Sequence, residues 1–201
     1  MSTKAIIFDI DGVLADSREA VVRNTCTLMQ EFGFIVNAEE VENMSRAHSA
    51  DTVLLSLEPS LGQNSELLKK MLKRLSHLSQ ENLAMIKPLS LASSVPALAG
   101  KYRLAAASNR KGSAKPVLET LGISQYFEAV VTSADAPAKP SPEMIELALI
   151  KLRVKAGEAV FVGDNLEDRQ AGEAAGVRTV IVNGADPPSV KIFLAEFLPG
   201  A

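Results

Sequence analysis

Five short runs of almost entirely apolar residues recur along the chain. They cover Ala5–Phe8, Arg103–Ala107, Ala129–Thr132, Ala159–Val162 and Thr179–Val182. A strand that is covered on both faces has such a continuous apolar pattern, whereas a half-exposed strand alternates apolar and polar residues. Helical patterns separate the last four runs, and this alternation is typical of a parallel sheet. The sequence therefore predicts an α/β fold with a doubly wound parallel sheet.

The helical patterns between these runs have recognisable starts and ends. Three helices are expected, over residues 113–121, 141–152 and 168–175. Gly122 and Gly176 follow the first and the third, and Pro142 stands in the first turn of the second. Proline at the first turn and glycine just after the last are the usual boundaries of a helix.

Residues 17–86 break the alternation of strand and helix. Asp16, with Glu19 three positions later, can cap a helix that ends at Gly33. A shorter helix is expected over about Ala50–Leu57, and a second long one carries an apolar stripe of Leu67, Leu68, Met71, Leu72, Leu75 and Leu78. We therefore expect two domains: an α/β core of residues 1–16 and 87–201, and a helical domain of residues 17–86 inserted after the first strand.

Composition and charge exclude several kinds of partner. With 21 basic and 24 acidic residues the net charge is −3, which gives no global signal for binding to nucleic acid or to a membrane surface. Tryptophan is absent and aromatic residues make up 4%, which argues against base-stacking platforms. The single cysteine, Cys26, cannot form an intramolecular disulfide, so a cytoplasmic location is expected. No feature of the sequence specifies the oligomeric state.

Polar residues follow the apolar runs at the points where strands end. They are Asp9, Asp11 and Gly12 after the first run, Ser108 and Asn109 after the second, Lys139 beyond the third, and Asp164, Glu167 and Asp168 after the fourth. Ligands of a doubly wound sheet bind outside the carboxyl ends of its strands. We therefore expect these residues to converge on one site.

The collected residue types suit phosphoryl transfer. Two carboxylates as close as Asp9 and Asp11 repel each other unless a cation lies nearby, and carboxylates are ligands that Mg2+ prefers. Lysine and serine side chains can take the remaining phosphate oxygens, and an aspartate is a competent nucleophile toward phosphorus. Gly12 lets the backbone turn and bring its amides close to a ligand.

Four segments resemble the motifs of the haloacid dehalogenase superfamily of phosphotransferases, in order and in spacing. They are Asp9-Ile10-Asp11-Gly12-Val13, Ser108-Asn109, Lys139-Pro140 and Gly163-Asp164-Asn165-Leu166-Glu167-Asp168. The resemblance covers nearly the whole chain, and residues 17–86 resemble the small helical cap of that superfamily. The pattern is similar to phosphoglycolate-phosphatase-like enzymes and to β-phosphoglucomutase-like enzymes.

The resemblance implies a role for each matched residue. Asp9 attacks phosphorus and becomes an aspartyl phosphate, and Asp11 is the general acid and base. Members that cleave carbon–halogen or carbon–phosphorus bonds lack this second aspartate, so Asp11 points to phosphate esters. Mg2+ is expected at Asp9, the carbonyl of Asp11, and Asp164 or Asp168. The transferring phosphoryl group and the substrate are expected to contact Ser108, Lys139, Asn109 and Gly12.

The helical domain is expected to close over the site, exclude water and select the substrate. Its polar segment 44–49 is the candidate for substrate contact. Arg46 there can bind a second anionic group of the substrate, with a solvent-exposed turn as the alternative. His48 is a weaker candidate for the catalytic base, because Asp11 already fills that role.

The expected function is a Mg2+-dependent phosphatase of a small phosphorylated metabolite. Ser45-Arg46 and Glu167-Asp168 also favour a β-phosphoglucomutase-like phosphosugar mutase, whereas Gly163-Asp164 is the phosphatase form of the last motif. A catalytically idle binding protein is a further alternative, although such proteins usually lose a motif acid. A phosphorelay receiver domain would carry its phosphorylated aspartate on the third strand. Arg169 replaces a small or apolar residue without an evident reason.

Overall fold

The computed structural model describes residues 2–45 and 49–199. The chain packs into two compact units, one of Met1–Asp16 with Lys87–Ala201 and the other of Ser17–Ile86. We call them the sheet unit and the helical unit. No helix of the described part of the chain is long and apolar enough to cross a membrane.

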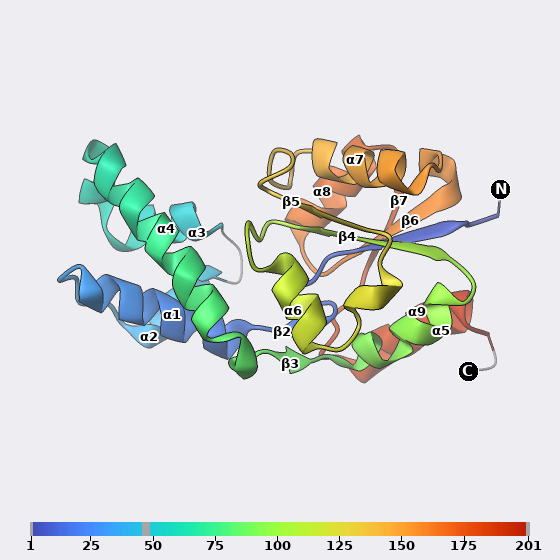
Figure 1. Cartoon of the computed structure of the whole chain (residues 1–201), viewed down its shortest axis with the longest axis horizontal. Coiled ribbons are helices and arrows are strands. Elements are labelled where there is room, and N and C mark those ends of the chain that lie inside the picture. The colour runs from blue at the N-terminus through green and yellow to red at the C-terminus, as the bar shows by residue number, and fades with distance from the viewer. Residues whose placement is uncertain (1, 46–48, 200–201) are drawn as a thin grey trace. The chain divides into compact units, whose positions relative to one another are not determined.

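The sheet unit contains a parallel five-stranded sheet, in the order β5-β4-β1-β6-β7 (Figure 1). The strands are β1 (Ala5–Phe8), β4 (Arg103–Ser108), β5 (Ala129–Thr132), β6 (Ala159–Gly163) and β7 (Arg178–Ile181). All five coincide with the predicted apolar runs to within one residue at either end. The predicted α/β fold with a doubly wound parallel sheet is therefore confirmed, and β1 is its central strand.

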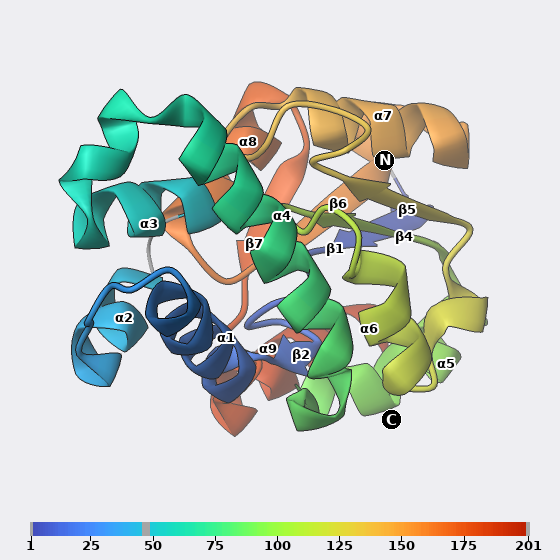
Figure 2. The same cartoon turned by 60° about the vertical axis from the view of Figure 1, so that its left-hand side comes forward.

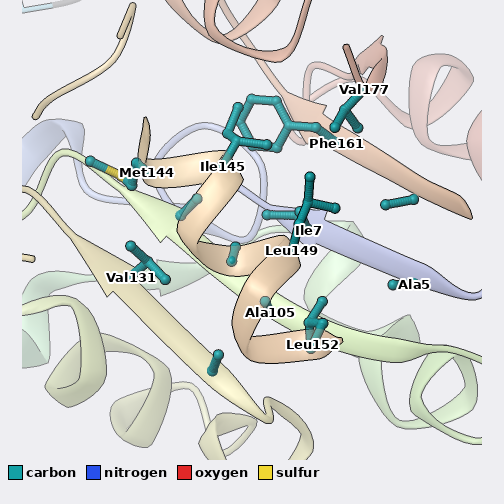
Figure 3. Packing of buried hydrophobic residues seen from close by; sticks show 14 of the residues in the cluster. Ala5, Ile7, Ala105, Val131, Met144, Ile145, Leu149, Leu152, Phe161 and Val177 are labelled. Carbon is teal, nitrogen blue, oxygen red and sulfur yellow. The ribbon is translucent and has the colours of Figure 1, made fainter. Parts of the chain in front are cut away.

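Helices cover both faces of this sheet (Figure 1). α7 (Glu143–Leu152) and α8 (Leu166–Ala174) lie on one face, and α5 (Val95–Ala99), α6 (Ala114–Thr120) and α9 (Pro187–Phe197) lie on the other. Figure 3 shows Ile145 and Leu149 of α7 packed over Ile7 of the central strand, all of them buried. On the opposite face, Phe8 meets the ring of Phe193 edge-on at 6.2 Å between centroids. Burial on both faces explains why the central strands β1 and β6 are apolar throughout.

α8 begins at Leu166, two residues before the predicted start at Asp168. Its N-cap is Asn165, whose side chain accepts a hydrogen bond from the backbone N–H of Asp168 at 3.0 Å. The Asp168 carboxylate in turn accepts from the backbone N–H of Asn165. This reciprocal pair satisfies two amides that the first turn leaves without helical partners, so the helix starts earlier than Asp168.

A tight turn and a short ribbon follow β1. Gly12 has a φ of 74° and donates its N–H to the carbonyl of Ala15 at 3.0 Å. β2 (Ala15–Asp16) then pairs antiparallel with β3 (Lys87–Pro88). The chain therefore leaves the sheet unit along one strand of this ribbon and returns along the other.

The described part of the helical unit contains α1 (Arg18–Glu31), α2 (Ala38–Ser45), α3 (Ala50–Leu57) and α4 (Ser65–Glu81), visible at the blue-to-green end of Figure 2. Its buried core consists of Leu28, Met29, Leu54, Leu61, Met71 and Leu78. The N-cap of α1 is Ser17 and not Asp16, which lies in β2. Short 3-10 turns cover Pro59–Gln63, Leu83–Met85, Ser90–Ser94, Ser124–Tyr126 and Ala156–Glu158 in the two units.

Candidate active site

Asp9 directly follows the central strand, at the carboxyl edge of the sheet. Its backbone N–H continues the strand pairing by donating to the carbonyl of Val162 at 2.8 Å. The residue is only 5% exposed. Because β4 and β6 flank β1, the segments that follow these two strands lie on either side of Asp9. The position of the Asp9 backbone is thus set by the central strand, which is paired on both sides.

Lys139 lies between two buried carboxylates. Its Nζ is 2.8 Å from Oδ1 of Asp9 and 2.6 Å from Oδ1 of Asp168. Burial alone would lower the pKa of this ammonium group, but the neighbouring charges of Asp9 and Asp168 raise it above its ordinary value. Lys139 therefore stays charged, and it presents a fixed cation directly beside Asp9.

Asp9 and Asp164 both hold their protons more tightly than ordinary aspartates. Burial raises the pKa of Asp9 to about 8, against the lowering effect of Lys139 and with further repulsion from Asp168 and Asp11. Burial and the charge of Asp168 raise the pKa of Asp164 to about 7. Lys139 alone does not balance the charges of Asp9, Asp164 and Asp168, so a further cation beside these three would relieve the repulsion.

The arrangement of three acids fits a divalent cation. Asp9, Asp164 and Asp168 each offer an oxygen, and these oxygens lie within 4.8 Å of one another. Gly12 lies directly against Asp164, because a Cβ atom at residue 12 would lie 1.9 Å from Oδ2 of Asp164. Carboxylate oxygens that lie this close together are the donor set of a hard cation.

The three acids differ in how far their oxygens are engaged. Asp168 is fully buried; its Oδ1 pairs with Lys139, and its Oδ2 accepts from the backbone N–H of Asp164 at 3.0 Å. Asp164 is only partly buried, and its Oδ1 accepts from the side chain of Asn165 at 3.0 Å. Asp168 thus holds Lys139 and the start of α8, while Asp164 is the more accessible oxygen donor.

Ser108 and Asn109 come from the end of β4. Ser108 is buried, and its Oγ accepts from the backbone N–H of Arg110 at 3.3 Å. The side chain of Asn109 accepts from the backbone N–H of Lys139 at 2.8 Å and donates to the Lys139 carbonyl at 3.2 Å. Asn109 therefore ties the Lys139 loop to β4.

Arg110 is a residue of the site that the sequence analysis did not single out. Its Nε and Nη2 donate to the two carboxylate oxygens of Asp11, both at 2.7 Å, and its Nη1 donates to Ser113 at 3.0 Å. Burial disfavours the charge of the guanidinium, but the carboxylates of Asp11 and Asp9 raise its pKa above the ordinary value. The only sequence signal was a cation directly after Ser108-Asn109.

Three further residues named from the sequence lie elsewhere. Arg46 and His48 lie outside the described residues. Arg169 lies on α8, where its side chain is exposed and its backbone N–H donates to the carbonyl of Asn165 at 3.3 Å. An exposed helix position accepts arginine without cost, which accounts for its departure from small or apolar residues.

Comparison with known proteins places the chain among hydrolases. The sequence profile of the family described as "Haloacid dehalogenase-like hydrolase" matches residues 6–182. The pyrophosphatase PpaX of Bacillus pumilus is 28% identical over 178 residues, which cover 87% of this chain and 80% of the relative. The phosphoglycolate phosphatase of Yersinia pestis is 27% identical over 180 residues, covering 86% and 78%.

Solved structures are similar over almost the whole chain. A haloacid dehalogenase-superfamily hydrolase of subfamily IA from Geobacter sulfurreducens is 28% identical, with a TM-score of 0.70 and coverage of 92% of this chain and 89% of the other. The β-phosphoglucomutase of Clostridium difficile has a TM-score of 0.75 at 20% identity, covering 94% and 87%. At this identity, the second likeness concerns the fold alone.

Proposed function

The chain belongs to the haloacid dehalogenase-like hydrolase family, and on that premise we propose that it hydrolyses a small phosphomonoester through a phosphorylated Asp9. Its family and the phosphatases among its relatives identify it as a phosphoric monoester hydrolase. The observation that carries the mechanism is the buried contact between Asp9 and Lys139 at the end of the central strand. A carboxylate nucleophile and a fixed cation are the two parts that phosphoryl transfer needs.

In the first step, a carboxylate oxygen of Asp9 attacks phosphorus and the bond from phosphorus to the ester oxygen breaks. The carboxyl group of Asp11 gives its proton to that oxygen, so the alcohol leaves neutral. Lys139 and the hydroxyl of Ser108 hold the other phosphoryl oxygens and offset the charge that gathers on them. The products of this step are the alcohol and an aspartyl phosphate.

In the second step, water attacks the phosphorus of the aspartyl phosphate. The Asp11 carboxylate, left ionised by the first step, takes a proton from that water. The bond between phosphorus and the Asp9 oxygen breaks, which releases inorganic phosphate and restores the Asp9 carboxylate. Asp11 recovers its proton, so the site is ready for another substrate.

We propose Mg2+ as the cation of this site, held by Asp9, Asp164 and the carbonyl of Asp11. Asp168 then supports the site by holding Lys139, because both of its oxygens are already engaged. When bound, the cation shields the phosphate charge from the Asp9 carboxylate. The same buried acids give the apo site its raised pKa values, so metal and protons compete for it.

The substrate class is a small phosphorylated metabolite, with the helical unit, Ser17–Ile86, as the part that selects it. Relatives named as a phosphoglycolate phosphatase and as a pyrophosphatase support a compact phosphate compound over a macromolecule. Phosphoglycolate and pyrophosphate are therefore the first two compounds to compare with a generic aryl phosphate. A sugar phosphate that is isomerised and not hydrolysed would favour the mutase instead.

The proposal is tested by hydrolysis of 4-nitrophenyl phosphate with Mg2+, with EDTA, and by the variants Asp9→Asn and Asp186→Asn. Asp9→Asn should abolish turnover, whereas Asp186→Asn should not, because asparagine also caps α9 and lies outside the site. Acid-quenched parent enzyme should carry a base-labile phosphoryl group that Asp9→Asn lacks. Turnover that survives in Asp9→Asn, or that is equal in EDTA, contradicts the mechanism.

A further inference from the structure

The side chain of Arg110 forms two hydrogen bonds with Asp11 and a third with Ser113. Nε and Nη2 each donate to one oxygen of the Asp11 carboxylate at 2.7 Å. Nη1 donates to the Oγ of Ser113, the buried N-cap residue of α6. The backbone N–H of Arg110 donates to Ser108. The guanidinium therefore has a fixed position, set by residues on either side of it along the chain.

The side chain of Asp11 is more exposed than those of Asp9 and Asp168. Its side chain is 38% exposed, whereas that of Asp9 is 7% exposed and that of Asp168 is fully buried. Asp11 lies in the turn that follows β1, outside the five-stranded sheet. A two-point contact with a planar guanidinium fixes both the position and the plane of a carboxylate.

We propose that Arg110 is a positioning residue for Asp11, which it holds in the orientation that both proton transfers require. This inference rests on the proposed function. Each carboxylate oxygen has two lone pairs, so an oxygen that accepts from Arg110 keeps a second one, which bears the proton given to the ester oxygen in the first step and takes the proton from water in the second. Misplacement of a reacting group by about 1 Å costs about 10²-fold in rate, which is the scale of effect that Arg110 controls.

This role differs from direct contact with the substrate in a measurable way. A general acid matters most when the leaving oxygen is strongly basic, and little when the leaving group is already a stable anion. A residue that acts through Asp11 must therefore affect poor leaving groups more than good ones. A residue that binds the phosphoryl group must affect both equally, because that group is the same in all phosphomonoesters.

The test compares kcat and KM of the parent, Arg110→Gln, Arg110→Lys, Asp11→Asn and the double variant Asp11→Asn/Arg110→Gln. Phenyl phosphate serves as the poor leaving group and 2,4-dinitrophenyl phosphate as the good one. Arg110→Gln should lower kcat/KM, which reports the first step alone, about 30-fold or more for phenyl phosphate but less than about 3-fold for the dinitrophenyl ester. Arg110→Lys should rescue little, because an ammonium group cannot form the two-point contact.

The double variant adds a second criterion. If Arg110 acts through Asp11, the substitution at Arg110 should cost no more than about 2-fold once Asp11 is already asparagine. Lys115→Gln, which removes an exposed cation from α6, should match the parent on both substrates. Circular dichroism and thermal melts of each variant check that the fold is intact.

Three results overturn the inference: equal loss on the two esters, full additivity in the double variant, or parent-like kinetics of Arg110→Gln. Equal loss with a raised KM would assign Arg110 to the phosphate itself. These results are separate from failure of the proposed function, which is decided by Asp9→Asn. An active Asp9→Asn variant removes the premise, whereas an inactive one leaves the Arg110 series to decide the inference.

Discussion

The ion pairs of Lys139 in the sheet unit and of Arg74 in the helical unit have opposite surroundings. In the sheet unit, Lys139 is 3% exposed and pairs with Asp9 and Asp168 at 2.8 and 2.6 Å. In the helical unit, Arg74 is 31% exposed and pairs with Glu31 at 2.8 Å and with Glu81 at 2.9 Å. The distances are nearly the same, but the surroundings are not. Solvent screens the pairs of Arg74, whereas the pairs of Lys139 lie in the protein interior.

The contrast indicates which unit carries the chemistry. Buried charges are expensive to desolvate, so a cluster of them contributes little to stability and is maintained where it does something else. The described residues of the helical unit bury a leucine- and methionine-rich core and leave their ion pairs at the surface. Stability and catalysis are therefore separable in this molecule, and four predictions test that separation.

The largest effect is expected from Lys139→Ala. Removing the buried cation leaves Asp9 and Asp168 facing each other, and it removes a fixed charge from the phosphoryl oxygens. Turnover of 4-nitrophenyl phosphate should fall by about 10³-fold. Lys191→Ala, which removes an exposed lysine of α9, serves as the matched control and should retain parent activity. A Lys139→Ala variant with more than a tenth of parent activity would place the catalytic charge elsewhere.

The next effect concerns stability in the helical unit. Leu54 is fully buried in its core, so Leu54→Ala should lower the free energy of unfolding by about 3 kcal/mol through lost contacts and the cavity left behind. Ile35→Ala removes a side chain that is fully exposed and should leave stability unchanged. Urea denaturation measures both. If kcat of folded Leu54→Ala on 4-nitrophenyl phosphate fell along with its stability, the proposed separation would be wrong.

A smaller effect is expected from pH in the metal-free protein. The folded protein raises the pKa of Asp9 from 3.8 to about 8 and that of Asp164 from 3.8 to about 7. Between these limits the folded state binds more protons than the unfolded state, so stability should fall as pH rises from about 4 to 8. The melting temperature in EDTA should therefore be lower at pH 8 than at pH 5.

Mg2+ and the substitution Asp164→Asn should both weaken the decline of the melting temperature with pH. Mg2+ replaces protons at the acids, so it should raise the melting temperature more at pH 8 than at pH 5. Asp164→Asn removes one of the two titrating groups and should flatten the decline in EDTA. A parent melting temperature that stays constant or rises over this range would contradict the raised pKa values.

The smallest effect is expected from Arg74→Ala. Its ion pairs with Glu31 and Glu81 are exposed at the surface of the helical unit, where such pairs contribute little. The urea midpoint should not change measurably, and kcat should match the parent. A clear loss of stability at low salt that vanishes at high salt would show that these pairs matter more than their exposure indicates.

Much of the sheet unit could be predicted from the sequence because its strands are buried on both faces. Ile6, Ile7 and Phe8 are all fully buried, so their apolar run was visible without knowledge of the partners. The resemblance to the haloacid dehalogenase superfamily, carried by four motifs, is confirmed by the comparisons. The roles of the individual site residues stay predictions.

Some short elements could not be predicted, because they have no hydrophobic pattern in the sequence. α2 has one buried residue, Val41, and therefore no apolar stripe. β2 and β3 are two residues each, too short for any periodicity. α9 is different, because Asp186 as N-cap and Pro187 at the first position are start signals that were present in the sequence but were not used.

Contacts between side chains that are distant in the sequence could not be predicted either. Arg110 and Asp11 lie 99 residues apart, and they meet because β4 is hydrogen-bonded to β1. The sequence analysis placed the ends of these strands at one edge of the sheet. It did not show how far an arginine side chain reaches across that edge, because this depends on rotamers that the whole loop determines.

The ribbon of β2 and β3 makes the helical unit a removable part of the chain. Asp16 and Lys87 are direct partners in that ribbon, so the two ends of the 70-residue insertion start from neighbouring positions. Two residues of turn-forming sequence suffice to join antiparallel strands into a hairpin. The sheet unit can thus be closed on itself or given another insert at this point, which makes the ribbon a natural graft site for exchanging the helical unit while the acids at the sheet edge stay in place.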